Sequence, residues 1–243
     1  MYIDYDFMKR SIPIIMTRIP VTILLTVVAF LIALVFGTIF AYINFKRVRG
    51  ISKVIRIYMS IIRGTPVILQ IYVIYNLTPL LLSRLFEALS LDVNIYLIEP
   101  IWYAFFALSL AATVSIAEAL RAGLESIDKG QFEAGLSVGL SEVKVLFSII
   151  LPQAFTNVFP VIGNVVVELI KSTSLAFMMS VVEITAQAKI LGGEVLRYFE
   201  GYLCVFIIYI FLIKIVEIIN GQIERKISIY RFGTKIKRIA GEN

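Results

Sequence analysis

The chain has 243 residues, of which 59% are hydrophobic and only 16% are charged, and its formal net charge is +6. A soluble globular domain needs more polar surface than this composition supplies, so the sequence indicates an integral membrane protein with one domain over residues 1–243. The absence of histidine and the single cysteine, Cys204, exclude a histidine-based catalytic triad and an intrachain disulfide. The carboxylates show no metal-ligand spacing.

Apolar segments long enough to cross a membrane, which takes about 20 residues, predict an all-α protein with five transmembrane helices. Before the first of them, residues 5–20 predict a short amphipathic helix on the outer surface of the membrane. The second segment contains Arg63, Thr65 and Pro66, which interrupt its apolar run. We expect the spans at residues 21–45, 53–82, 101–122, 145–170 and 201–222.

Residues 172–200, between the last two predicted spans, are too polar and too short to form two further spans. An apolar stretch is followed there by a polar stretch with two adjacent glycines, which predicts a re-entrant helical hairpin on the outer side. Irregular backbone at membrane depth requires burial by protein or contact with water.

Lysine and arginine residues are unevenly distributed between the two sides of the predicted spans. The positive-inside rule places the side with the excess in the cytoplasm. We therefore expect a multi-pass protein of the cell membrane, with its N-terminus outside and its C-terminus in the cytoplasm. The cationic residues behind this prediction are Lys46, Arg47, Arg49, Lys53, Arg56, Arg63, Arg121, Lys129, Lys144, Arg225, Lys226, Arg231, Lys235, Lys237 and Arg238.

The connection between the third and fourth spans, residues 123–144, is the most polar run between two long apolar segments. We expect one short helix within residues 126–140, followed by a turn at Gly139, where glycine tolerates a positive φ angle. Ser141 is the predicted cap of the next helix, and Pro152 is expected to bend the fourth span because proline has no amide hydrogen. An ordinary solvent-exposed helical connection is the alternative interpretation.

Residues 133–152, EAGLSVGLSEVKVLFSIILP, resemble the EAA loop of the permease subunits of ABC importers. They match the pattern E-A-A-x3-G-x9-I-x-L-P at every fixed position but one, because Gly135 stands where the pattern has its second alanine. Short motifs elsewhere resemble those of polar amino-acid permeases, and the resemblance extends over residues 22–221. These motifs are Arg63-Gly64-Thr65-Pro66, Glu118-x-x-Arg121-Ala122-Gly123, Gly130-Gln131-x-Glu133-Ala134 and Lys171-Ser172-Thr173-Ser174-Leu175.

Two positions depart from the amino-acid permease pattern. Ala122 replaces a glycine, and Val165 stands where many members carry an acidic residue, so a carboxylate role at that position does not carry over to this chain. Val165 and the strings at residues 173–177 and 181–184 resemble those of cystine-type members. This resemblance makes cystine or another sulfur amino acid the first substrate expectation.

The resemblance implies the fold of a type I ABC importer permease, in which this connection holds a coupling helix that docks a cytoplasmic ATPase, with Phe132 as an apolar anchor. It also implies a permease pair, formed with a second copy or a paralogue, and a solute-binding protein that delivers the amino acid at the outer face. The chain lacks the G-x4-G-K-[ST] phosphate-binding sequence, so ATP and Mg²⁺ belong to the partner ATPase and no cofactor is expected on this chain. The residues implied in coupling are Arg121, Gly130, Gln131, Phe132, Glu133, Ala134 and Gly139.

Ionisable side chains inside a span cost about 2.5–3.5 kcal/mol each at its centre, so they usually have a partner or a task. Asn164, Glu168, Lys171 and Ser172 follow helical spacing and lie on one stripe of the fourth span. The stripe offers an amide, an anionic acceptor and a cationic donor to a zwitterionic amino acid, whose ammonium is expected to pair with Glu168. An intrahelical ion pair between Glu168 and Lys171 is an equally open alternative.

Two other spans contribute polar side chains that are further substrate candidates. For hydroxyl groups, a hydrogen bond to a carbonyl of their own helix is the more common alternative. Glu118 lies near the cytoplasmic end of its span and is expected to pair with Arg121 rather than to contact substrate. The candidates are Thr113 and Ser115 in the third span and Gln70 and Asn76 in the second.

Other function classes stay open at this stage. An ion-coupled secondary amino-acid transporter needs a proton or sodium relay inside the membrane, for which Glu168 and Lys171 are the candidates. A membrane enzyme needs a nucleophile that faces a base, and Ser172 beside Lys171 is a weak option because adjacent residues on a helix point apart. A structural anchor would need no polar residues inside its spans.

Overall fold

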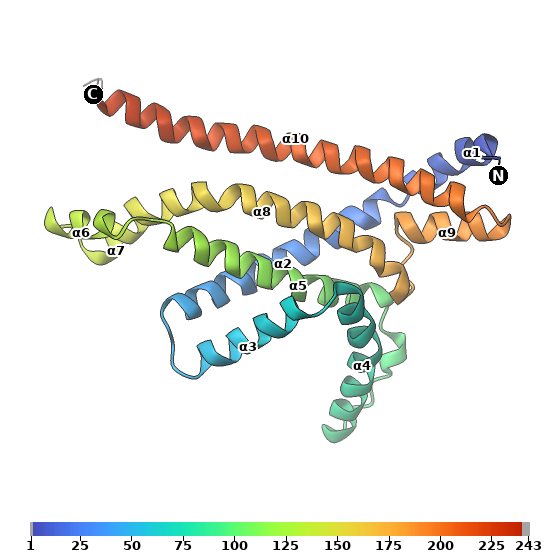
Figure 1. Ribbon diagram of the computed structural model, residues 1–243. Helices are drawn as coiled ribbons and strands as arrows, with labels where there is room; N and C mark the ends of the chain where they lie inside the picture. Colours follow the sequence, from blue (N-terminus) through green and yellow to red (C-terminus); the bar gives the residue numbers. More distant parts are fainter. Residues whose placement is uncertain (1, 240–243) are drawn as a thin grey trace.

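The computed structural model describes residues 2–239, and every regular element in this part of the chain is a helix. The elements are α1 (Tyr5–Met16), α2 (Ile19–Phe45), α3 (Ile51–Gly64), α4 (Val67–Ala88), η1 (Ile95–Leu97), α5 (Pro100–Glu125), α6 (Lys129–Ser137), α7 (Glu142–Val145), η2 (Leu146–Ile150), α8 (Leu151–Thr173), η3 (Ser174–Met179), α9 (Ile184–Glu194) and α10 (Tyr198–Ile239). In the described chain, five helical segments are long and apolar enough to cross a membrane, as the sequence predicts. Figure 1 shows an elongated bundle with α6 and α7 at one end and α1 and α9 at the other.

Helix α5 is central to the bundle because α2, α3, α4 and α8 all pack against it. Small side chains let membrane helices approach each other closely. At the contact with α2, a Cβ atom on Gly37 would lie 2.8 Å from Cγ2 of Ile116, so the two backbones meet where no larger residue fits. The buried face of α5 is correspondingly rich in alanine: Ala104, Ala107, Ala112, Ala117 and Ala119.

The segment predicted as one span over residues 53–82 is two helices, α3 and α4, which corrects the boundaries expected from the sequence. Thr65, between them, has an extended backbone with φ −119° and ψ 137°, and Pro66 is the N-cap of α4. Proline has no amide hydrogen for the preceding turn, and it disfavours helical backbone in the residue before it. Of these two helices, α4 is the one long and apolar enough to span a membrane.

The side chain of Gln70 holds this break together. Its Nε2 donates to the carbonyl oxygen of Ile62 at 2.7 Å and to that of Thr65 at 2.8 Å. These carbonyls lie at the end of α3, where no amide of the same helix can reach them. Gln70 is itself buried, so the structure gives this substrate candidate a bracing role.

We expect Gln70→Met to lower the free energy of unfolding by about 1–3 kcal/mol, because it keeps the side-chain volume and leaves the carbonyls of α3 without their donor. The midpoint of thermal unfolding in detergent measures the loss. Asn76→Met is the matched control, since Asn76 is exposed and donates to a carbonyl of its own helix. Equal losses in the two variants would contradict the bracing role.

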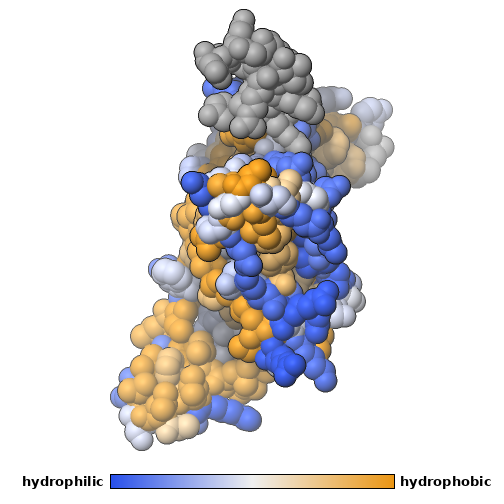
Figure 2. Space-filling view, turned by 90° about the vertical axis from the view of Figure 1, so that its left-hand side faces the viewer, coloured by the Kyte–Doolittle hydropathy of each residue, from blue (hydrophilic) through white to orange (hydrophobic). Residues whose placement is uncertain are grey.

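Helix α4 leaves the bundle at a steep angle (Figure 1). Only 11% of the most apolar stretch of α4 is buried, against 67% of the corresponding stretch of α5. In Figure 2 this helix forms the apolar surface at the lower left. A surface of this kind is covered by lipid or by another protein chain. Its exposed apolar side chains include Leu69, Val73, Leu77, Leu80, Leu81 and Leu85.

The predicted hairpin at residues 172–200 consists of the 3₁₀ turn η3 and helix α9. Glu183, which is fully buried, caps α9 by accepting hydrogen bonds from the amides of Thr185 and Ala186, both at 2.8 Å. The hydroxyl of Tyr209 on α10 donates to the same carboxylate at 3.2 Å. The two helical arms of the predicted hairpin are therefore confirmed as η3, the shorter, and α9. The depth of the hairpin in a membrane stays a prediction.

The remaining predicted spans correspond to α2, α5, the segment that contains α8, and α10. The fourth is the longest candidate span, a continuous helical segment over Glu142–Met179. The irregularity expected at Pro152 is present just before it, as the π-helical turn η2. A π-helical turn is a local widening that often marks a functional position in a helix.

Candidate functional site

Helix α6 is the short helix that the sequence predicts in the third connection. Asp128 caps it, with Oδ1 accepting the amide hydrogen of Gly130 at 2.6 Å. Gly139 follows with a φ angle of +81°, and the hydroxyl of Ser141 accepts the amide hydrogen of Lys144 at 3.4 Å. The predicted glycine turn and the predicted cap of the next helix are both confirmed.

Gly135 explains why the loop departs from the EAA pattern. It is the buried residue of α6, and it packs against Val145 and Ile149 of the following segment. A Cβ atom at this position would lie 2.6 Å from Cγ2 of Val145, which is fully buried and cannot move aside easily. Glycine therefore seats α6 directly on the start of the fourth span.

The outer surface of α6 carries most of the predicted coupling residues. Phe132 is half-buried and lines a cavity of about 520 Å³ together with Phe45 and Leu146, and its role as an apolar anchor stays a prediction. The exposed apolar side chains near it are Leu136, 39% exposed, and Val138, 76% exposed. Sequence reasoning did not single out either residue, although the position of Val138 directly before Gly139 is a usable signal. The exposed coupling candidates are Arg121, Gly130, Gln131, Glu133, Ala134 and Gly139.

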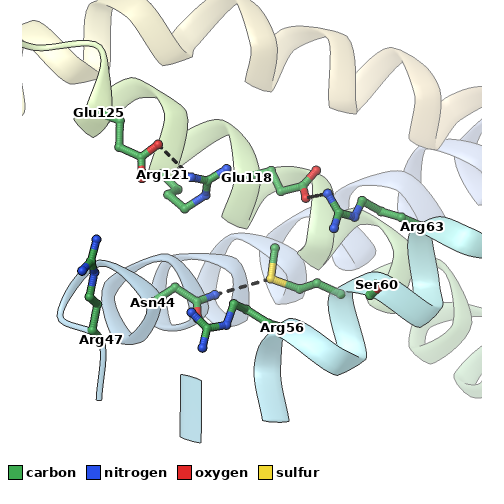
Figure 3. Close-up of a pocket in the computed structure, with 9 residues that line it drawn as sticks. Asn44, Arg47, Arg56, Ser60, Arg63, Glu118, Arg121 and Glu125 are labelled. Atoms are coloured by element: carbon green, nitrogen blue, oxygen red, sulfur yellow. Dashed lines mark hydrogen bonds and ion pairs between the residues drawn. The ribbon is translucent and has the colours of Figure 1, made fainter. Parts of the chain in front are cut away.

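The expected ion pair between Glu118 and Arg121 is wrong. Glu118 pairs with Arg63 of α3, and Arg121 pairs with Glu125 one turn further along α5, at 2.7 Å (Figure 3). The break before α4 lets α3 run back beside α5, which places Arg63 opposite Glu118. Arg121 then takes the acidic residue at the favourable i,i+4 spacing of its own helix.

The polar stripe of α8 is present as predicted. Asn164, Glu168 and Lys171 are exposed, and Ser172 beside them is half-buried. Nζ of Lys171 lies 2.8 Å from Oε1 of Glu168, so the chain forms the intrahelical ion pair that was one of the two alternatives. The side chains nevertheless stay 50% and 69% exposed, respectively. Such a pair stabilises a helix by only about 0.2–0.5 kcal/mol, so both charges remain available to a ligand.

Three of the other substrate candidates form hydrogen bonds within their own part of the chain. Thr113 is buried and donates to the carbonyl of Ser109 at 2.7 Å, which confirms the expected bond to its own helix. Gln70 braces the break between α3 and α4, and Asn76 donates to the carbonyl of Tyr72 at 2.7 Å. The structure therefore does not direct these three side chains to the stripe on α8.

Ser115 faces a groove of about 450 Å³ between α5 and α8. A Cβ atom on Gly123 would overlap Cγ2 of Val158, so the side chain of Val158 on α8 packs directly on the backbone of α5 at this position. Val161 also lines the groove and lies one turn before Asn164 on α8. The groove therefore leads along α8 toward the polar stripe.

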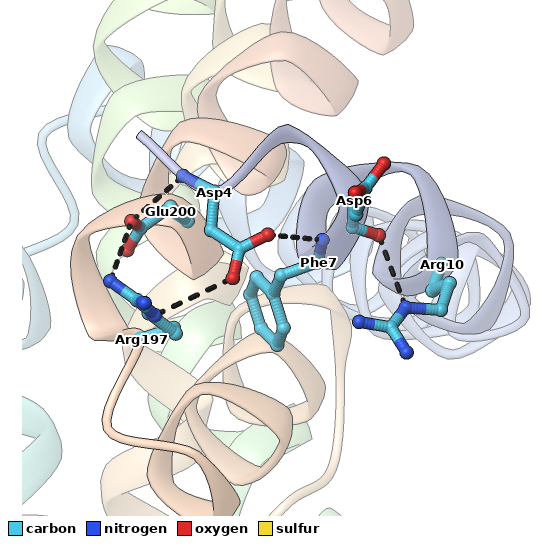
Figure 4. A network of polar contacts seen from close by, with 6 residues as sticks. All are labelled: Asp4, Asp6, Phe7, Arg10, Arg197 and Glu200. Carbon is cyan, nitrogen blue, oxygen red and sulfur yellow. Dashed lines mark hydrogen bonds and ion pairs between the residues drawn. The ribbon is translucent and has the colours of Figure 1, made fainter. Parts of the chain in front are cut away.

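At the opposite end of the bundle, α1 is tied to the start of α10 (Figure 4). The backbone amide of Asp4 donates to Oε1 of Glu200 at 3.3 Å, and its carboxylate caps α1 by accepting the amide hydrogen of Phe7 at 2.9 Å. Arg197 bridges the two acids, with Nε 3.6 Å from Asp4 and Nη1 3.7 Å from Glu200. These contacts confirm a helix in the N-terminal segment and fix it across the end of the bundle.

Comparison with known proteins agrees with this geometry. The family model described as "Binding-protein-dependent transport system inner membrane component" matches residues 33–229. The probable amino-acid permease protein YxeN of Bacillus subtilis (strain 168) is 35% identical, over 93% of this chain and 96% of its own length. The L-cystine transport system permease protein TcyB of the same organism is 33% identical, over 94% of this chain and 93% of its own length.

Solved structures give the same result. The crystal structure of an amino acid ABC transporter with histidines matches with a TM-score of 0.78 and 26% identity, over 93% of this chain and 100% of its own. An inward-facing structure of the MetNI methionine ABC transporter matches with a TM-score of 0.66 at 15% identity, which shows a shared fold. The chain therefore belongs to the family of binding-protein-dependent transport system inner membrane components, as a permease subunit of an ABC importer whose ATP is hydrolysed by a separate ATPase subunit.

Proposed function

We propose that this permease imports a polar amino acid across the cell membrane, with cystine or another sulfur amino acid as the first candidate substrate. The observation that carries the proposal is the exposed polar stripe of α8, in which Glu168 and Lys171 present opposite charges side by side. A zwitterion can bind to both charges at once. Because the pair has no net charge, it suits a substrate without net charge better than a cationic one.

The relatives support this substrate class and leave the individual amino acid open. TcyB, named for L-cystine, is 33% identical to this chain, and ArtQ, named for arginine transport in the same organism, is 30% identical. These identities differ too little to decide between the two substrates. The neutral charge of the stripe is what favours cystine over arginine.

In the proposed assembly the permease pairs with a second copy or a paralogue, and the exposed apolar surface of α4 supplies contact area for that pairing. The end that carries α6 faces the cytoplasm and the ATPase. The end that carries α1 and α9 faces outward, where a solute-binding protein delivers the amino acid. This orientation follows from the positive-inside rule, since the arginines and lysines of the α2–α3 connection lie at the same end of the bundle as α6.

ATP acts in this assembly by biasing one of two membrane conformations. The ATPase binds α6, and closure of the ATPase dimer moves the two α6 helices of the permease pair relative to each other. A conformational shift of this kind requires that the ATPase binds α6 with different free energies in the two states. Because α6 is seated on the fourth span through Gly135, its movement reaches the helix that carries the polar stripe.

Reversing or introducing a charge on the outer surface of α6 tests whether this surface docks the ATPase. We expect Glu133→Arg, and separately Val138→Asp, to reduce the ATPase that co-purifies with the tagged permease by about tenfold, because interface hot spots cost at least about 1–2 kcal/mol when changed. Glu194→Arg is the matched control, since Glu194 is exposed on α9 at the opposite end. Normal co-purification of both α6 variants would contradict docking through α6.

Uptake into proteoliposomes tests the transport proposal. The permease is reconstituted with its ATPase and binding protein, and the uptake of labelled cystine, arginine and glutamine is compared with and without ATP inside. We expect ATP-dependent uptake, fastest for cystine. Uptake that proceeds without ATP and follows a proton or sodium gradient would instead establish the alternative, an ion-coupled secondary amino-acid transporter.

A further inference from the structure

A third cavity lies between α2, α3 and α5, at the end of α5 that leads to α6 (Figure 3). Its volume is about 490 Å³, within the range of about 300–1,000 Å³ that is usual for small-molecule sites. The polar stripe of α8 does not line it, so this cavity is separate from the proposed substrate site. Arginine side chains dominate its wall: Arg47, Arg56, Arg63 and Arg121.

The charges in this cavity do not balance. Glu118 and Glu125 also line it, and they pair with Arg63 and Arg121. Within the described chain, the guanidinium groups of Arg47 and Arg56 have neither an ion pair nor a hydrogen bond. Two positive charges, those of Arg47 and Arg56, therefore face the cavity without an acidic side chain of the described chain to pair with them. A guanidinium presents its donors in a planar fork that matches the oxygens of a phosphate group.

Asn44, in the wall of the same cavity, has an unsatisfied acceptor. Its Nδ2 lies 3.5 Å from the sulfur of Met59, and its Oδ1 is buried without a partner. Buried carbonyl oxygens normally accept at least one hydrogen bond, and leaving one unpaired costs about 1–3 kcal/mol. A ligand hydroxyl beside the phosphate-binding arginines would satisfy this atom.

Helix α3 indicates where such a ligand comes from. It has three faces: one is buried against α2 and α5, and one carries the arginines of the cavity. The third face is apolar and exposed, with Val54, Ile57 and Ile61 each more than half exposed. A helix with separate basic and apolar faces is typical of a membrane interface, where acyl chains cover the apolar side and anionic headgroups meet the basic side.

We propose that this cavity binds the headgroup of an anionic phospholipid that bears a free hydroxyl, of the phosphatidylglycerol kind. Arg47 and Arg56 hold the phosphodiester, and Oδ1 of Asn44 accepts a hydrogen bond from the headgroup hydroxyl. The acyl chains lie along the apolar face of α3. The inference uses the orientation proposed above only to assign the lipid to the cytoplasmic leaflet.

The test titrates dioleoylphosphatidylglycerol, with dioleoylphosphatidylcholine as comparison, into the delipidated full-length chain in neutral detergent. Native mass spectrometry counts the lipids retained, and it does so without any transport, so a failure of the transport proposal leaves this result intact. We expect Arg47→Gln and Arg56→Gln each to weaken phosphatidylglycerol binding about fivefold, the effect of one cationic side chain near an anionic headgroup. Arg49→Gln, exposed in the same connection and outside the cavity, is the matched control.

Gel filtration checks that each variant is folded. Arg56→Lys keeps the positive charge without the planar fork of the guanidinium, and we expect it to bind phosphatidylglycerol more tightly than Arg56→Gln does. Equal weakening by Arg49→Gln would show general attraction to a basic surface and overturn the site. Displacement of the lipid by inorganic phosphate at equal concentration would overturn the lipid as occupant, because a free anion would then suffice. Equal retention of the two lipids by the unchanged protein would also overturn it.

Discussion

Replacing Gly135 by alanine will uncouple ATP hydrolysis from transport while the permease still inserts into the membrane. The added Cβ would lie 2.6 Å from Cγ2 and 3.0 Å from Cγ1 of Val145, and 3.4 Å from Cδ1 of Ile149. Val145 is fully buried and β-branched, so relief requires α6 to shift away from the fourth span. Overpacking of this kind costs about 1–3 kcal/mol, which corresponds to a change of about five- to 150-fold in a coupling equilibrium.

The measurement is the ATP hydrolysis of the reconstituted importer, stimulated by the loaded binding protein. Because the EAA pattern itself has alanine at this position, the clash depends on Val145, and Val145→Ala in the Gly135→Ala background should restore coupling. Val145→Ala alone is the control for the cavity that it leaves. If Gly135→Ala is as active as the unchanged protein, the seat of α6 does not transmit the movement.

Exchanging the charges of Glu168 and Lys171 will separate the two interpretations of the stripe on α8. If Glu168 binds the substrate ammonium, Glu168→Gln removes a charge-assisted hydrogen bond worth about 1.5–3 kcal/mol, and the apparent substrate affinity falls about ten- to 100-fold. If the two residues only stabilise their helix, the loss is about 0.2–0.5 kcal/mol, less than about threefold. The expected result is the larger loss, measured as uptake at increasing substrate concentration.

The double variant Glu168→Lys with Lys171→Glu decides the case. It keeps the ion pair, whose i,i+3 spacing is unchanged, but it presents the opposite charge to each end of a bound amino acid. A helix-stabilising pair tolerates the exchange, and a substrate contact does not. Normal uptake by the double variant, with normal assembly of both variants, would return Glu168 to a purely structural role.

The spans could be predicted from the sequence because an apolar run of sufficient length has few alternatives in a membrane. Residues 53–82 show the limit of that argument, since overall hydropathy does not reveal that Thr65 and Pro66 separate two helices. Local chemistry predicted the turn at Gly139 and the cap at Ser141, because both depend on the residue itself. The polar stripe of α8 was predictable for the same reason, since helical spacing determines it.

The contacts between elements could not be predicted in this way. Glu118 has a suitable partner in its own helix, and only the return of α3 beside α5 brings Arg63 into competition for it. The cavity that Phe132 lines with Phe45 and Leu146 is a second example, because residues distant in the sequence form it. The capping of α9 by Glu183 is predictable from the rule that an acidic residue often precedes a helix. The contact between Glu183 and Tyr209 is not predictable in this way, because it depends on the position of α10.

The fourth span runs without interruption from the α6 end of the bundle to the polar stripe near its other end. At 1.5 Å per residue, the helix between Val145 and Glu168 is about 35 Å long. If the ATPase moves α6, we expect this helix to transmit the movement as a rigid rod that tilts about the π-helical turn at Leu146–Ile150. A rotation of about 5° there displaces the far end of such a rod by about 3 Å, which is enough to separate or join two groups that share a hydrogen bond.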